Sequence, residues 1–259
     1  MRVLILGEGK SGTTALLRSV SAALGQPTEL FEPRELTPDD IAPDPLVIKK
    51  LLLNWQQSEA QLTEQFDKRL FITRDPRDRL ISRLLYDAYN KAPALDEAKR
   101  ERWLKVLEKK AADPQGVPLL KLLEKWWRIS GTDLLSHYVR GADRSQRFLR
   151  QREPNFYQLK YEDYVDQNFE ALQAYLGIEL AAGVVEGPEQ RVARKGSHGD
   201  WRYWFTRADV RVLRPMSYTA LKIQGYNQRD WALERVDSLE RETTVDYVRK
   251  LFELHPLSP

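Results

Sequence analysis

The fold of this chain is decided by the stretch Gly7-Glu8-Gly9-Lys10-Ser11-Gly12-Thr13-Thr14. Before it comes Val3-Leu4-Ile5-Leu6, an apolar run typical of a buried strand, and after it residues 15–20 have helical spacing. A strand, a glycine-rich turn and a helix in this order form a cradle for phosphate. Glycines let the backbone approach an anion, and the amides at the helix start point at it. Lys10 adds a full positive charge, so the sequence predicts an anion site here.

Two alternatives stay open for this stretch. One is a plain strand-to-helix turn without a ligand. The other is the nucleoside-triphosphate motif G-x-x-x-x-G-K-[ST], which requires a glycine five residues before the glycine that precedes the lysine. Counting back from Gly9 reaches Leu4, inside the expected strand, so the triphosphate pattern is not met.

The composition narrows the class of protein. A chain of 259 residues that is 42% hydrophobic and 31% charged is typical of a soluble globular protein with a full core. It has no cysteine, which excludes disulfides and thiol catalysis, and its three scattered histidines predict no metal site. No apolar run approaches the ~18 residues of a bilayer span and no signal peptide is recognised, so a cytoplasmic location is expected. The net charge of +3 does not favour nucleic acid but suits a small polyanion.

Short apolar segments alternate with helical ones along the chain. Strands are expected at residues 3–6, 28–31, 46–51, 70–73 and 156–161, and helices at 13–24, 55–66, 77–89 and 162–175. Residues 37–45, rich in proline and aspartate, are expected to form a loop, and residues 91–142 a helical block. This alternation predicts one α/β domain over residues 1–259, with a parallel sheet covered by helices on both faces.

A second anion-binding pattern is Arg74-Asp75-Pro76-Arg77-Asp78, which follows an expected strand and opens a helix that carries Ser82. A guanidinium beside a helix start matches phosphate oxygens, although such a sequence is also common at ordinary helix starts. Two phosphate sites on successive strand ends indicate a ligand with two separated phosphates.

A third pattern follows near the C-terminal end, where residues 194–206 read Arg-Lys-Gly-Ser-His-Gly-Asp-Trp-Arg-Tyr-Trp-Phe-Thr. This segment is the last of four motifs along the chain. The other three are Lys-Ser-Gly-Thr-Thr at 10–14, the Arg74 segment and Tyr161-Glu162-Asp163. In these motifs the chain resembles the superfamily of sulfotransferases that use 3'-phosphoadenosine 5'-phosphosulfate (PAPS), and it is closest to the cytosolic branch. The resemblance spans about four-fifths of the chain and implies a P-loop-like α/β architecture.

The resemblance implies a role for each matching residue. The loop formed by Lys10, Ser11, Gly12, Thr13 and Thr14 would hold the 5'-phosphosulfate, with Lys10 neutralising the leaving oxygen. Arg74 and Ser82 would hold the 3'-phosphate, and Arg194, Lys195 and Gly196 would close over it as a flap at residues 194–206. Tyr161 would lie near the adenine, while Glu162 and Asp163 would be structural. The transfer resembles phosphoryl transfer in being in line and dominated by positioning and charge, and it requires no metal.

The general base is where the sequence departs from the cytosolic pattern. Those enzymes carry Lys-Thr-His at a strand end, and the corresponding stretch here is Lys49-Lys50-Leu51. Other branches use a glutamate after the first helix, and Phe31-Glu32-Pro33 resembles the Phe-Glu-Pro of carbohydrate sulfotransferases. We hypothesise that Glu32 is the base, with Glu35 as the second choice and Lys49 assisting at the sulfuryl group. The alternative for Glu32 is an ordinary surface glutamate, and His198 occupies a variable flap position.

The remaining predictions concern the acceptor and assembly. The expected acceptor is a hydroxyl, or secondarily an amine, of a small molecule or carbohydrate, in a pocket shaped by the block 83–142. Trp103, Trp126 and Trp127 could line that pocket, although helical spacing favours the core. Arginines at 207 and 211 replace the valine and glutamate of a known cytosolic dimer motif, so that dimer is not supported. A P-loop small-molecule kinase and a nucleotide-binding protein without turnover remain as rival functions.

Overall fold

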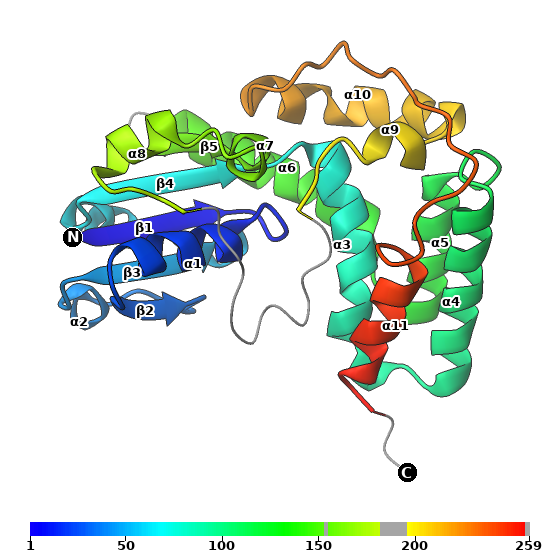
Figure 1. Ribbon diagram of the computed structural model, residues 1–259, viewed down its shortest axis with the longest axis horizontal. Helices are drawn as coiled ribbons and strands as arrows, with labels where there is room; N and C mark the ends of the chain where they lie inside the picture. Colours follow the sequence, from blue (N-terminus) through cyan, green and yellow to red (C-terminus); the bar gives the residue numbers. More distant parts are fainter. Residues whose placement is uncertain (153–154, 182–195, 257–259) are drawn as a thin grey trace. The chain divides into compact units, whose positions relative to one another are not determined.

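The computed structural model describes residues 1–152, 155–181 and 196–256, and Figure 1 shows its ribbon. The chain divides into two compact units. Unit 1 consists of Met1–Asp75 and Asp143–Ala193, and unit 2 consists of Pro76–Ala142 and Arg194–Pro259. One of the divisions falls within helix α6 (Leu134–Arg152). The single domain expected over residues 1–259 stays a prediction.

Unit 1 is built on a five-stranded parallel sheet in the order β2-β3-β1-β4-β5. Its strands are β1 (Arg2–Gly7), β2 (Thr28–Phe31), β3 (Leu46–Leu51), β4 (Lys68–Thr73) and β5 (Tyr157–Lys160). The arrowheads of β1, β3 and β4 point the same way in Figure 1. β1 lies at the centre of the sheet. Its last residue, Gly7, is paired in register with Leu51 of β3 on one side and with Ile72 of β4 on the other. The expected α/β fold with a parallel sheet flanked by helices is confirmed.

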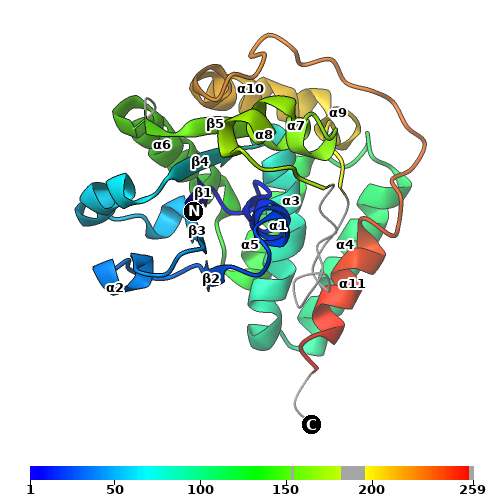
Figure 2. The ribbon, with the colours of Figure 1, turned by 60° about the vertical axis from the view of Figure 1, so that its left-hand side comes forward.

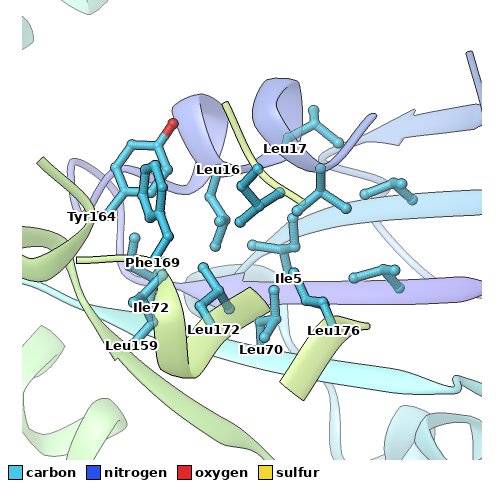
Figure 3. Close-up of a cluster of buried hydrophobic side chains, with 14 of the residues drawn as sticks. Ile5, Leu16, Leu17, Leu70, Ile72, Leu159, Tyr164, Phe169, Leu172 and Leu176 are labelled. Atoms are coloured by element: carbon cyan, nitrogen blue, oxygen red, sulfur yellow. The ribbon is translucent and has the colours of Figure 1, made fainter. Parts of the chain in front are cut away.

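The helices of unit 1 are α1 (Thr13–Ala23), α2 (Pro38–Ile41), η1 (Leu52–Asn54), η2 (Gln57–Gln65), the second half of α6, α7 (Tyr161–Val165) and α8 (Glu170–Leu176). Among them α1, α7 and α8 pack on the sheet through one apolar cluster. Figure 3 shows Leu16 of α1 and Leu172 of α8 meeting Ile5, Leu70 and other side chains of the strands. Aliphatic side chains on both faces of β1 explain why this strand is buried along its length. The cluster fixes the start of α1 relative to the strand ends.

Unit 2 is helical in the part of the chain that the structure describes. It contains α3 (Pro76–Lys91), η3 (Ala92–Ala94), α4 (Glu97–Ala112), α5 (Leu119–Ser130), the first half of α6, α9 (Trp201–Trp204), α10 (Arg207–Ile223) and α11 (Val245–Glu253). In Figure 2, α11 lies beside α4. The ring centroids of Trp103 and Trp126 lie 4.8 Å apart inside this helical unit, and both side chains are fully buried.

Several local expectations were wrong. Residues 37–45 are not only loop, because Thr37 and Asp40 form a capping box that begins the short helix α2. By contrast, the helix expected at 55–66 is present as a 3-10 helix at residues 57–65. The helix expected at 162–175 is two helices, α7 and α8, and Gln167 between them has a left-handed φ of 60°. The amphipathic pattern alone does not reveal such an interruption.

Candidate anion-binding and catalytic site

The candidate residues of unit 1 follow the carboxyl ends of its strands. Glu32, Arg74 and Tyr161 are each the first residue after their strand, β2, β4 and β5 respectively, and the glycine-rich loop 8–12 follows β1. Because the strands are parallel and in register, these positions lie along one edge of the sheet. Ligands of open α/β sheets bind at this edge.

The loop after β1 has an unusual backbone. Lys10 has a φ of 71° and Gly12 a φ of 92°, both in the left-handed region. The amide and the hydroxyl of Ser11 both donate to the carbonyl oxygen of Glu8, at 3.2 and 2.7 Å. Ser11 is therefore engaged inside the loop. Ser11 and Thr13 are buried, whereas Lys10 and Thr14 are partly exposed. A non-glycine residue held in this conformation is a common mark of a functional site.

Three of the four sequence motifs meet at this loop. Arg74 Nη1 donates to the carbonyl oxygen of Lys10 at 3.3 Å, and the guanidinium lies 4.3 Å from the ring centroid of Tyr161. The same ring packs against Gly12 so closely that a Cβ on Gly12 would lie 2.4 Å from its Cδ2 atom. Glycine at position 12 is thus required by the close approach of Tyr161 as well as by its backbone angle. The loop, Arg74 and Tyr161 form one packed group.

Helix α7, which begins with Tyr161, is hydrogen-bonded both to α1 and to the residues that follow β4. The hydroxyl of Tyr164 lies 2.6 Å from Ser19 Oγ and donates to the carbonyl oxygen of Ala15 in α1. Burial raises the pKa of Tyr164 above its ordinary value. The carboxylate of Glu162 accepts the amide of Asp75 at 3.0 Å. Glu162 thus bonds to the backbone directly after Arg74, and its structural role stays a prediction.

The candidate base lies at the adjacent strand ends. Lys49 of β3 forms an ion pair with Glu32, and its Nζ lies 4.0 Å from the ring centroid of Phe31. Lys49 is almost fully buried, whereas 31% of the Glu32 side chain is exposed. Glu32 is another non-glycine residue with a left-handed φ, 52°, and its amide donates to the Lys49 carbonyl at 2.8 Å. Glu35 is exposed, and the structure brings Glu32 and Lys49 together without it.

In unit 2, Arg77 and Asp78 from the Arg74 motif contact the described residues of the flap motif. The carboxylate of Asp78 accepts the amides of Gly199 and Trp201 at 2.6 and 2.9 Å. The guanidinium of Arg77 lies 3.8 Å from a ring centroid of Trp201 and 5.0 Å from one of Trp231. The spacing of either motif gave no sign of this pairing, because it joins residues over 100 positions apart.

The remaining cofactor candidates are in unit 2 or outside the described residues. Ser82 is buried on α3, and Gly196 is exposed. Arg194 and Lys195 lie outside the described residues. The roles of these four residues at a 3'-phosphate stay predictions.

The tryptophans and histidines have different environments. Trp103 and Trp126 are core residues, as their helical spacing favoured, while Trp127 is 54% exposed. His198 is exposed. Burial and the charge of Arg140 lower the pKa of His137 on α6.

Sequence reasoning missed the partners of Glu8. This loop residue is only 7% exposed, and its carboxylate oxygens lie 3.3 Å from Arg144 Nη2 and 3.3 Å from Ser145 Oγ, both on α6. A charged residue between two glycines was the only local signal, and it gave no indication of the partner.

Metal clusters and membrane-spanning helices are both absent from the described residues. Among them no cluster of three or more histidine, cysteine or acidic side chains is arranged to hold a metal ion. No helix in these ranges has the length and hydrophobicity of a bilayer span. A scan against protein-family models found no match, and neither did searches of the curated proteins and of the solved structures.

Proposed function

We propose that this protein is a sulfotransferase that moves the sulfuryl group of PAPS to a hydroxyl of a small-molecule or carbohydrate acceptor. The observation that carries the proposal is the packed group of loop 8–12, Arg74 and Tyr161. It joins two cations and a helix start at the carboxyl edge of a parallel sheet, which is a favourable environment for a phosphate or sulfate.

The roles of the chain's residues follow from their chemistry. Lys10 and the amides at the start of α1 stabilise charge on the oxygen that bridges phosphate and sulfur as the bond between that oxygen and sulfur breaks. Glu32 accepts the proton of the acceptor hydroxyl while the new oxygen–sulfur bond forms. Lys49 orients the Glu32 carboxylate through their ion pair. The product that leaves is adenosine 3',5'-bisphosphate, and charge stabilisation by lysine and the helix dipole requires no metal.

The first test is a calorimetric titration with adenosine 3',5'-bisphosphate, without magnesium and with ATP as the comparison ligand. We expect micromolar or tighter binding of the bisphosphate. Arg74→Ala should weaken it by about 100-fold, because it removes a charge-assisted contact worth roughly 1.5–3 kcal/mol together with the support of Lys10. Arg69→Ala is the matched control, since Arg69 is on the same strand but near its other end. Binding of ATP alone, and only with magnesium, would favour a kinase.

A second test addresses the base. Glu32→Gln keeps the size of the side chain but removes the proton acceptor, so kcat should fall by about 100- to 10,000-fold with bisphosphate affinity retained. Glu35→Gln is compared in parallel. Full turnover in Glu32→Gln, or a loss confined to Glu35→Gln, would remove Glu32 from the mechanism.

A further inference from the structure

Unit 1 contains a fully buried ion pair next to the candidate base. Lys50 Nζ lies 2.7 Å from Glu59 Oε1, and the two side chains are 0% and 1% exposed. Lys50 follows Lys49 on β3, so the two lysines point to opposite faces of the sheet. Burying two charges is costly unless further hydrogen bonds compensate them, so such a pair calls for an explanation.

The pair is bonded to the segment that follows Glu32. Lys50 Nζ donates to the carbonyl oxygens of Pro33 at 3.1 Å and Arg34 at 2.9 Å. Glu59 Oε1 accepts the amide of Leu36 at 2.7 Å. Three of the four residues after Glu32 are therefore anchored to one buried pair.

Glu59 is in turn fixed by its own helix. Its Oε2 atom accepts the amide of Gln56 at 2.8 Å, at the start of η2. The carboxylate thus links η2, β3 and the segment 33–36 by accepting a hydrogen bond from each of them. A carboxylate with this many donors cannot change position without breaking several of them.

Glu32 itself needs this support. Its left-handed backbone is unfavourable for a residue with a side chain, and such a conformation persists only where the surroundings impose it. On its N-terminal side the amide of Glu32 is held by the Lys49 carbonyl. On its C-terminal side the contacts come from Lys50 and Glu59.

We infer that Lys50 and Glu59 are positioning residues that hold the Glu32 carboxylate against Lys49 for proton transfer. This inference rests on the proposed function, because it gives Glu32 its task. It adds two residues that make no contact with the reacting groups and act through the backbone of residues 33–36. A merely structural pair would stabilise the fold without tuning the geometry of Glu32.

The experiment compares Lys50→Met, Glu59→Gln and the double variant, in which neither charge is left buried alone. Amide hydrogen exchange of residues 34–36 reports on the anchoring. Release of adenosine 3',5'-bisphosphate from PAPS gives kcat, KM and the pH profile of kcat, with water as the acceptor, which yields sulfate, or with p-nitrophenol, which yields p-nitrophenyl sulfate. The oxygen–sulfur bond of PAPS breaks, the acceptor oxygen takes the sulfuryl group, and Glu32 takes the proton.

We expect exchange at residues 34–36 to become at least about tenfold faster. We expect kcat to fall by about 10- to 100-fold with a changed pH profile, as misplaced reacting groups do. KM for PAPS and the affinity for the bisphosphate should stay within about twofold of the original values, because the loop 8–12 is intact. Lys110→Met is the matched control for exchange, since Lys110 is an equally buried lysine bonded to carbonyl oxygens in unit 2. It should leave exchange at residues 34–36 unchanged.

The outcomes separate the two proposals. If the unmodified protein neither binds the bisphosphate nor turns over PAPS, the proposed function fails and the inference fails with it. If the unmodified protein is active but the double variant keeps its pH profile and kcat, the inference alone is overturned. Unchanged exchange at residues 34–36 in every folded variant would overturn it as well. Faster exchange together with a lower kcat and a retained KM would support it.

Discussion

Replacing Gly12 with alanine tests the packed group around the cradle. A Cβ at this position would lie 2.4 Å from Cδ2 and 2.9 Å from Cε2 of Tyr161. The ring is buried and lies beside the guanidinium of Arg74, so it has little room to move aside. The left-handed backbone of Gly12 adds a second penalty, because alanine is disfavoured there.

The expected loss of stability follows from these two terms. A left-handed conformation costs a residue with a side chain about 1–2 kcal/mol. Overpacking by one carbon in a tight site costs roughly 1–3 kcal/mol. Gly12→Ala should therefore lower the free energy of unfolding by about 2–5 kcal/mol. Gly25→Ala is the matched control at the other end of α1: its φ is 68°, but a Cβ there meets nothing within 4 Å, so only the first term applies.

The assay is urea unfolding followed by far-ultraviolet circular dichroism, on both alanine variants, on Tyr161→Ala and on Gly12→Ala/Tyr161→Ala. Removing the Tyr161 ring makes space for the new Cβ, so the double variant should lose less than the two single variants added together. A Gly12→Ala variant as stable as Gly25→Ala, or losses that simply add, would refute the packing of Tyr161 on the loop.

Two further predictions concern unit 2. Burial lowers the pKa of Lys110 to about 8 from its ordinary 10.5. The unfolded chain therefore binds this proton more tightly than the folded protein does, and the free energy of unfolding should rise by about 2 kcal/mol between pH 8 and pH 10. The rise should be absent in Lys110→Met when the two proteins are compared by urea unfolding at each pH, and an equal rise in both would exclude Lys110 as its source. Asp78→Ala leaves the amides of Gly199 and Trp201 without their acceptor and should cost about 2–5 kcal/mol of stability, measured through tryptophan fluorescence in urea. A cost below about 1 kcal/mol would mean that water replaces the carboxylate at little expense.

The sequence was sufficient to predict the sheet and the position of the candidate residues along it. Runs such as Val3-Leu4-Ile5-Leu6 are short, apolar and free of proline, which is typical of strands buried on both faces. Once the strands are parallel, the residues that follow them must lie along one edge, and this brings Arg74 and Tyr161 to the loop after β1. The prediction needed only strand ends and direction.

Side-chain partners far apart in the sequence could not be predicted. The acceptor role of Asp78 toward Gly199 depends on where a loop over 100 residues later returns to α3. The pairing of Lys50 with Glu59 depends on how η2 packs against β3, which the sequence pattern does not give. In contrast, α2 carried a readable signal, because Thr37 followed by proline and, at the third position, an aspartate is a capping pattern.

Glu8 raises a difficulty for an anion bound at the loop, because a carboxylate so close would repel it. The geometry answers this difficulty, since both oxygens of Glu8 are directed to α6, where Arg144 and Ser145 contact them. The charge of Glu8 is thus compensated by Arg144, so an anion at the loop meets the charges of Lys10 and Arg74. Glu8 then serves as the link between the loop and α6. The same compensation makes an acidic residue in this loop compatible with the anion site that we propose.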